Sequence, residues 1–312
     1  MNKKICASQS ILLTMLVAAC GASTSPTVPI STLATVAVPS VQPLSASSTA
    51  SPVASNTPAP APVQPTLAST ITLPVASSTP APASSITLTW YGQSTFVLTA
   101  GANFKALLDP TGTGTGYKIP TLDQIDLVTV SHEHSDHNAV QLASGSPLVL
   151  RGLAGNDWAK IDQTVKGVRV RTVGVYHDEQ QGAQRGKNAI FVFEIGGLRL
   201  AHLGDLGHSL SPEQIQAIGP VDVILIPVGG FYTIDAKTAV QVIDQLNPRI
   251  VIPMHTKTGD LAASLASVLA PVDDFIKSLG EKATVSEVGQ TVTIEKGSLP
   301  AKLTVLVMKY KP

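Results

Sequence analysis

Three histidines and two carboxylates are crowded into one short stretch of the chain. Residues 131–137 read Ser-His-Glu-His-Ser-Asp-His. Imidazoles this close would repel one another if protonated, whereas neutral imidazole nitrogens are good ligands for a divalent cation. The chain has only 7 histidines, and His132, His134 and His137 fall in this stretch. A polar loop that happens to be rich in histidine is the alternative; the concentration of histidine favours a metal site.

Further candidate ligands stand where predicted strands end. His177 follows the apolar residues 173–176, Asp205 follows residues 200–204, and His255 follows the apolar run 250–252. Ends of strands on one edge of a sheet are where loops converge to build a site. A ligand set distributed in this way fits a catalytic metal centre better than a compact structural zinc site, and this part of the chain has no cysteine to build the latter.

The predicted secondary structure that must position these residues begins with several strands and continues along the chain with strands and helices in alternation. A hairpin is indicated at Gly196-Gly197, and a helix start at Ser211-Pro212, where Gln214 completes a capping box. Helices are predicted over 235–246 and 261–279. Strands are predicted over 86–91, 95–98, 106–108, 127–130, 189–195, 198–203, 223–226, 250–252, 291–295 and 303–308. This order predicts an α/β fold of two sheets covered by helices on their outer faces.

The motif His132-x-His134-x-Asp136-His137 resembles the signature of the metallo-β-lactamase superfamily, and the later candidates follow that family's order of motifs. The resemblance implies a four-layer αββα sandwich for residues 86–312. Segments 90–96, 204–208 and 252–256 are similar to a branch of uncharacterised metal-dependent hydrolases related to ascorbate-phosphate lactonase. That branch often has histidine where this chain has Gln93, which cannot do acid–base work.

Carried over to this chain, the resemblance implies a centre of two divalent cations. The implied ligands are His132, His134 and His177 for the first cation, Asp136, His137 and His255 for the second, and Asp205 as a bridge. Asp109 matches the family's early aspartate and would fix a ligating imidazole. His208 is a candidate for supporting a ligand or touching substrate, with a plain surface histidine as the alternative. His202, of opposite strand parity to Asp205, is expected to be structural.

Two cations of this kind can bind one hydroxide, lower its proton affinity and polarise a carbonyl or phosphoryl oxygen. Asp136 and Asp205 are the expected catalytic residues, with Asp136 orienting the nucleophile or moving a proton. We therefore expect hydrolysis of an ester-like bond in a small molecule: a lactone, a carboxylic ester or a phosphodiester. Zinc is the first choice of metal and manganese the second. The alternatives are a non-catalytic metal-binding surface lipoprotein or receptor, and an iron-dependent redox enzyme on the same fold.

The N-terminus has the pattern of an export signal. Lys3 and Lys4 precede an apolar run, 11–19, which is too short for a bilayer span of roughly 20 residues. Residues 16–20, Leu-Val-Ala-Ala-Cys, resemble a bacterial lipobox. The resemblance implies a signal peptide over 1–19, lipid attachment at Cys20, and an extracytoplasmic protein anchored to the cell membrane. The alternative is an ordinary secretory signal with an incidental cysteine.

The segment that follows, 20–85, is rich in Ser, Thr, Pro and Ala and has no charged residue. Frequent prolines prevent both helix and sheet from propagating, so we predict a disordered linker between the lipid and the folded domain. Once Lys3 and Lys4 are removed, the 21 acidic residues roughly balance the remaining basic ones. Because no basic block stands out, nucleic acid is not an expected partner.

The lipid anchor leads to a test by fractionation. Replacing Cys20 by Ser removes the only expected acceptor of the lipid, so we expect the Cys20→Ser protein to leave the membrane fraction for the soluble one. Cys6→Ser is the matched control, because Cys6 lies in the segment that would be removed. Immunoblots of separated membranes report the result. Membrane association of Cys20→Ser equal to that of the control would contradict the anchor.

Overall fold

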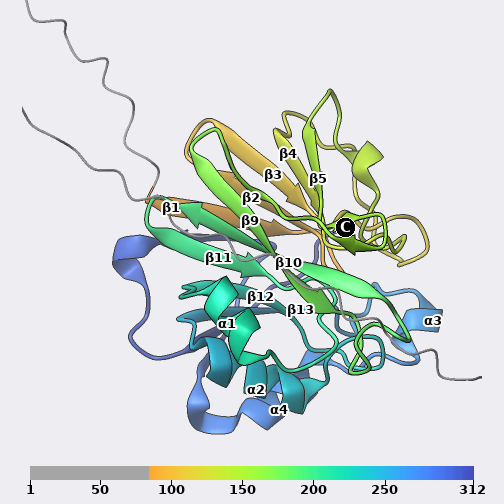
Figure 1. Cartoon of the computed structure of the whole chain (residues 1–312). Helices are drawn as coiled ribbons and strands as arrows, with labels where there is room; N and C mark the ends of the chain where they lie inside the picture. The colour runs from red at the N-terminus through yellow and green to blue at the C-terminus, as the bar shows by residue number, and fades with distance from the viewer. Residues whose placement is uncertain (1–83) are drawn as a thin grey trace, which may run out of the picture. The chain divides into compact units, whose positions relative to one another are not determined.

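The computed structural model describes residues 84–312 as two mixed β-sheets with few helices (Figure 1). The predicted signal peptide, Cys20 and nearly all of the predicted linker lie outside these residues and stay predictions. Within the described part, no helix combines the length and the apolar character needed to cross a membrane.

The first sheet has six strands in the order β15-β1-β2-β3-β4-β5. Strands β15, β1, β2 and β3 pair antiparallel, and β3, β4 and β5 pair parallel. The strands are β1 (Ser85–Trp90), β2 (Phe96–Ala100), β3 (Phe104–Leu108), β4 (Leu127–Val130), β5 (Leu148–Arg151) and β15 (Thr291–Glu295). A strand from near the C-terminus therefore closes one edge of a sheet built mostly from the start of the domain.

The second sheet has eight strands in the order β14-β16-β13-β12-β11-β10-β9-β8, and a separate two-stranded ribbon pairs β6 with β7. Its centre, β11-β12-β13-β16, is parallel, whereas β8 to β11 pair antiparallel. The strands are β6 (Leu153–Ala154), β7 (Asp157–Trp158), β8 (Asp162–Val165), β9 (Val168–Tyr176), β10 (Lys187–Ile195), β11 (Leu198–His202), β12 (Val223–Pro227), β13 (Ile250–Met254), β14 (Thr284–Glu287) and β16 (Thr304–Val307).

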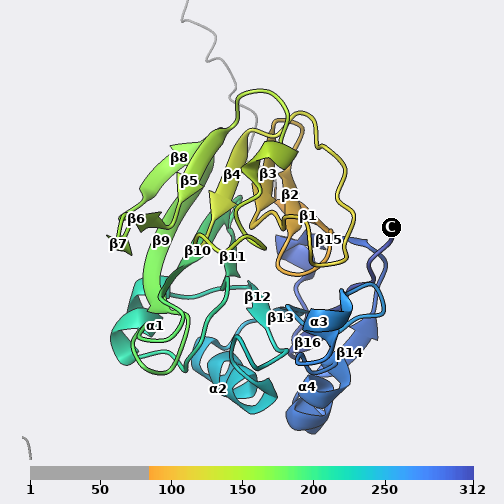
Figure 2. The ribbon, with the colours of Figure 1, turned by 90° about the vertical axis from the view of Figure 1, so that its right-hand side faces the viewer.

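The two sheets pack face to face, and alternation along β10 shows how. Phe191 and Phe193 point into the core between the sheets, whereas Ile190 and Val192 point into a second core under the helices. Successive strand residues face opposite sides, so one apolar strand serves both cores. The expected face-to-face packing of two sheets is confirmed (Figure 2).

The helices are short, and three of them cover the outer face of the eight-stranded sheet; the helix over Ala263–Ala266 packs instead in a separate apolar cluster with Tyr117, Leu261 and Leu269. The helices are α1 (Pro212–Ile218), α2 (Ala236–Leu246), α3 (Ala263–Ala266) and α4 (Val272–Leu279), with 3₁₀ turns η1 (Val140–Leu142), η2 (Gly280–Lys282) and η3 (Lys296–Ser298). The prediction of one helix over 261–279 is wrong. The helix α3 already ends at Ala266, and Pro271, which has no N–H for a helix interior, stands as the N-cap of α4, so the chain does not run through this point as one helix.

The outer face of the six-stranded sheet is covered differently. Val97, Leu107 and Val128 form a smaller apolar cluster there, packed against loop residues and against Leu142 of η1. Loops rather than an α-helix therefore shield this face. The same loops run toward the edge of the sheet where the candidate ligands stand.

The start of α1 offers a stability test. The Ser211 hydroxyl accepts a hydrogen bond from the Gln214 N–H, and the Gln214 side-chain oxygen accepts one from the Ser211 N–H. Loss of such a cap costs about 1 kcal/mol. We expect Ser211→Ala to lower the free energy of unfolding in urea by that amount, and exposed Ser298→Ala to change it little. Equal effects of the two substitutions would contradict the role of the cap.

Candidate metal centre

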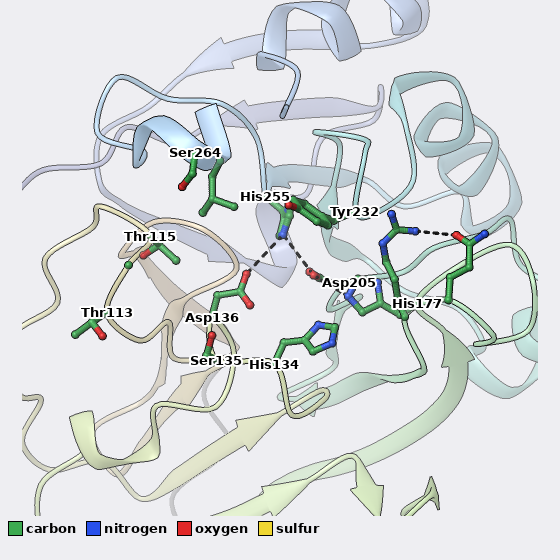
Figure 3. Close-up of a pocket in the computed structure, with 14 residues that line it drawn as sticks. Thr113, Thr115, His134, Ser135, Asp136, His177, Asp205, Tyr232, His255 and Ser264 are labelled. Carbon is green, nitrogen blue, oxygen red and sulfur yellow. Dashed lines mark hydrogen bonds and ion pairs between the residues drawn. The ribbon is translucent and has the colours of Figure 1, made fainter. Parts of the chain in front are cut away.

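All seven predicted ligands lie at one edge of the two sheets, just beyond strand ends. The loop 131–139 follows β4 of the first sheet; His177, Asp205 and His255 follow β9, β11 and β13 of the second. These three strands run in the same direction, so their carboxyl ends meet. Figure 3 shows His134, Asp136, His177, Asp205 and His255 gathered around one pocket.

Asp205 lies at the middle of the group and is only 2% exposed. Its Oδ2 lies 3.3 Å from Nε2 of His177 and 3.3 Å from Nε2 of His255. Its Oδ1 lies 3.2 Å from Nε2 of His137, and Oδ2 lies 3.9 Å from Nε2 of His132. The Asp205 carboxylate thus lies close to imidazoles predicted to bind the first cation and to imidazoles predicted to bind the second.

The donor atoms fall into two groups that could each hold a cation. Within each group the donor atoms lie within 4.8 Å of one another. The groups are His132, His134 and His177, and Asp136, His137, Asp205 and His255. Asp109 could form a third group with His132 and His137, but its carboxylate already accepts hydrogen bonds from Ser131 and His137.

The donors fit a cation better than they fit one another. Nε2 of His137 and Oδ1 of Asp205 are buried and have no hydrogen-bond partner within the described residues, although they face each other. Burial and the nearby His137 lower the pKa of His132 well below its ordinary value, which keeps it a neutral donor. Burial opposes charge on Asp205 as well, but the His137 and His255 imidazoles hold its pKa well below the usual range. The same contact acts in reverse on His137 and His255: burial lowers their pKa, but the Asp205 carboxylate outweighs burial and raises it, so a divalent metal would replace protons at these two imidazoles.

Asp109 contacts one of the predicted ligands directly. It is fully buried at the end of β3, it accepts a hydrogen bond from the Ser131 N–H at 2.8 Å, and it contacts Nδ1 of His137 at 2.9 Å. A carboxylate that holds Nδ1–H leaves Nε2 as the free donor nitrogen. Asp109 therefore fixes both the ring orientation and the tautomer of His137.

Two residues that the sequence left without a role position the carboxylates. Gln93 Nε2 donates to Asp136 Oδ2 at 3.2 Å, and the Gln93 carbonyl accepts from the His255 N–H at 3.3 Å. Asn188 is buried; its Oδ1 accepts from the Asp205 N–H at 3.2 Å and its Nδ2 donates to the Leu203 carbonyl at 2.9 Å. The amides do no acid–base work; they hold ligand-bearing backbone and side chains in place.

Other candidate residues lie apart from the donor atoms. Both ring nitrogens of His208 contact backbone, the Tyr176 N–H at 3.0 Å and the Ser209 carbonyl at 2.7 Å, so it supports His177 only through the neighbouring residue. His202 lies 2.8 Å from the Ser94 carbonyl and packs against Phe96, a structural position. Glu133 points away to pair with Arg151.

Two glycines let the backbone pack against the ligands. A Cβ at Gly207 would lie 2.2 Å from the His177 carbonyl carbon, and one at Gly229 would lie 2.2 Å from the His255 carbonyl oxygen. Contacts this short against backbone leave no room for a side chain. The loops after β11 and β12 therefore reach the ligand positions only because glycine stands at these points.

The donor atoms open into a cavity of about 430 Å³. Its walls come from the loop 113–115, from Arg185 in the β9–β10 loop, from Tyr232, and from Ser264 and Leu265 of α3. The cavity is large enough for a small organic molecule and combines polar and apolar walls.

The comparisons agree with this fold and site. The family model of the beta-lactamase superfamily domain matches residues 87–255. A crystal structure from Thermotoga maritima, named as a candidate Zn-dependent hydrolase of the metallo-β-lactamase superfamily, is 36% identical, with a TM-score of 0.57; the match covers 72% of this chain and 100% of that one. The chain belongs to the metallo-β-lactamase superfamily.

Curated relatives narrow the class. A UPF0173 metal-dependent hydrolase of Pyrococcus abyssi is 30% identical over 202 residues, which cover 58% of this chain and 87% of the relative. Another, from Carboxydothermus hydrogenoformans, is 28% identical over 228 residues, 66% of this chain and 99% of the relative. Within the superfamily, the chain is a member of the UPF0173 family of metal-dependent hydrolases.

Asp109 provides a test of how the centre is held. Asp109→Asn keeps the shape but removes the charge that orients His137, so we expect metal affinity to fall about tenfold to a hundredfold. Asp244→Asn, in an exposed pair with Lys282, is the control and should bind metal normally. Competition with a chromogenic chelator measures affinity, and thermal unfolding checks the fold. Equal affinities of the two variants would refute the orienting role.

Proposed function

We propose that this enzyme holds two divalent cations and hydrolyses an ester-like bond in a small molecule. In this proposal His132, His134 and His177 bind the first cation and Asp136, His137 and His255 bind the second. Asp205 is the bridge. The observation that carries the proposal is the position of the Asp205 carboxylate, which lies 3.3 Å from His177 of one group and 3.2 Å from His137 of the other.

The residues around the cavity have separate roles in the proposed hydrolysis. The cations, when bound, supply a hydroxide at neutral pH and polarise the oxygen of the scissile group. Asp136 lines the cavity with a quarter of its side chain exposed, and Gln93 holds it from behind. Asp136 is therefore placed to orient the attacking water and to pass its proton toward the leaving oxygen. Tyr232 and Leu265 form walls that keep a substrate over these donors.

The bond and the metal belong to the proposal as well. Lactones, carboxylic esters and phosphodiesters all present an electrophile with an oxygen that a cation can polarise, and all three are candidate substrates. The segments around Gln93, Asp205 and His255 support a relation to ascorbate-phosphate lactonase, which favours a lactone among them. Nitrogen and carboxylate donors without thiolate suit zinc first and manganese second.

The expected cellular location of the enzyme is also part of the proposal. The lipobox-like residues 16–20 support a lipid anchor at Cys20, and the proline-rich segment that follows supports a spacer between the membrane and the catalytic domain. The hydrolase would then act outside the cytoplasm on molecules that reach the cell surface.

A metal-resolved substrate screen tests the function. The protein is stripped with a chelator, reloaded with zinc, manganese or iron, and offered lactones, carboxylic esters and phosphodiesters. We expect about two metal ions per chain by elemental analysis and turnover that disappears with the metal and returns on reloading. Absence of turnover with every metal would contradict the proposal, as would iron content coupled to oxygen consumption.

His134 gives the sharpest single substitution. Its side chain is exposed, so His134→Ala leaves no core cavity, and after treatment with a chelator it should unfold like the wild type treated in the same way. We expect it to lose a metal ion and turnover by at least about a hundredfold, because the first cation would keep only His132, His177 and the shared Asp205. Glu133→Gln, in the same loop but turned toward Arg151, is the matched control. Unchanged turnover of His134→Ala with its full metal content would show that the ligand assignment is wrong.

A further inference from the structure

Arg185 is a charged group that the proposed chemistry does not use. It lines the cavity of the metal donors and also a neighbouring cavity of about 400 Å³ that shares His134 with it. Within residues 84–312, Arg185 and Arg249 are the arginines without a carboxylate inside 4 Å; the others pair with acidic residues. Arg249 is exposed and lines neither cavity. A guanidinium beside a catalytic cavity without a protein counter-ion is an available anion site.

The loop that carries Arg185 is held firmly next to the metal donors. Asp178, buried directly after His177, accepts hydrogen bonds from four backbone N–H groups of this loop. The donors are Gln180 at 2.8 Å, Gly182 at 2.9 Å, Gln184 at 3.0 Å and Arg185 at 2.7 Å. The backbone of Arg185 is therefore fixed relative to His177, and a ligand would not have to order this loop.

The guanidinium itself is oriented but not saturated. One Nη donates to the Phe231 carbonyl at 2.9 Å, the other donates to Gln184 Oε1 at 3.3 Å, and the group lies 5.8 Å from the centre of the Tyr232 ring. A guanidinium has five N–H donors, so these contacts leave donors free for the two oxygens of a carboxylate or phosphate. Phe231, 60% exposed, and Tyr232 add an apolar wall beside them.

The charge around the cavity also favours an anionic ligand. Two divalent cations outweigh the Asp136 and Asp205 carboxylates, and Arg185 adds a further positive charge on the same cavity. Such a cavity attracts anions and repels cations. A purely structural role, in which Arg185 only ties its loop to Phe231, would leave substrate charge without effect, and this difference can be measured.

We propose that Arg185 binds an oxyanion of the substrate, so that this enzyme selects small anionic esters whose apolar part lies against Tyr232. The proposal rests on the hydrolytic function proposed above and adds the substrate class. The oxyanion is a carboxylate or a phosphate-like group, and the scissile bond lies at the metal donors. No bond to Arg185 forms or breaks; it contributes binding and orientation only.

The first experiment compares paired substrates on the metal-loaded enzyme. The pair is 4-carboxyphenyl butyrate and its methyl ester, which carry the same scissile bond and differ in a distant charge; 4-phosphonophenyl butyrate replaces the carboxylate by a phosphate-like group. Wild type, Arg185→Gln and Arg249→Gln are measured. Comparing variants on each substrate cancels intrinsic reactivity. Arg249 is a matched control because its guanidinium also donates to a backbone carbonyl, that of Ala301.

We expect Arg185→Gln to lower kcat/KM for the anionic esters about tenfold to a hundredfold, the value of hydrogen bonds to a charged group, and to spare the neutral ester. Whichever anionic ester, the carboxylate or the phosphonate, shows the larger fall in kcat/KM carries the oxyanion that Arg185 prefers. Arg249→Gln should resemble the wild type on all three substrates. Equal losses on charged and neutral esters would show a structural role and overturn the proposal, as would no loss on either.

A binding measurement separates this proposal from the hydrolytic one. Terephthalate and its monomethyl ester both offer one carboxylate to the cations, but only terephthalate has a second. We expect terephthalate to raise the Tm of the zinc-loaded wild type more than the monoester does, and this difference to vanish in Arg185→Gln. If terephthalate raises the Tm more than the monoester does but no ester is hydrolysed, the oxyanion site is retained and the hydrolytic function is rejected. If esters are hydrolysed but the two ligands raise the Tm equally, the hydrolytic function is retained and the oxyanion site is rejected.

Discussion

The structure depends on one buried carboxylate. Asp205 is sealed from solvent at the meeting point of four imidazoles, and an ionised carboxylate in such a place is unfavourable unless positive charge lies against it. Burial lowers the pKa of His137 and His255, but the Asp205 carboxylate outweighs burial and raises the pKa of both imidazoles, so that protons on them supply this charge when no metal is bound. A divalent cation would supply the charge in place of these protons. Metal binding is therefore expected to stabilise the folded protein as well as to serve its chemistry.

That carboxylate needs a scaffold from both sheets. The first sheet supplies the 131–139 loop, Asp109 and Gln93; the second supplies His177, Asp205 and His255, with Asn188 holding the Asp205 backbone. The apolar core between the sheets, in which Phe191 and Phe193 lie, sets the distance between these two contributions. A change in core packing would thus move donor atoms relative to one another.

The sequence was sufficient for what is local or periodic. Clustered histidines, capping residues and apolar runs identified the loop 131–137, α1 and many of the strands, and the expectation of two sheets followed from their order. The strands β5, β8 and β14 were not predicted; most residues of β8 and β14 are exposed and form no apolar run, and half of β5 is exposed. The sequence failed where distant packing decides. The break between α3 and α4 is a local exception: Pro271 stands in the sequence where the second helix begins, and it was given too little weight in predicting one continuous helix. The role of Asn188 could not be predicted, because nothing nearby in the chain shows that its side chain will accept a hydrogen bond from the Asp205 N–H. Arg185 carried no signal, since an unpaired guanidinium is visible only once the neighbouring carboxylates have been placed.

The ligand set is divided along the chain as well as in space. His132, His134 and His137 are made early in the domain, but His255 comes only after β13, which must be inserted between β12 and β16 before it can present that histidine. The complete ligand set therefore exists only when both sheets are in place and packed together, so that metal binding is coupled to this packing. Retention of bound metal would then report that the two sheets are joined.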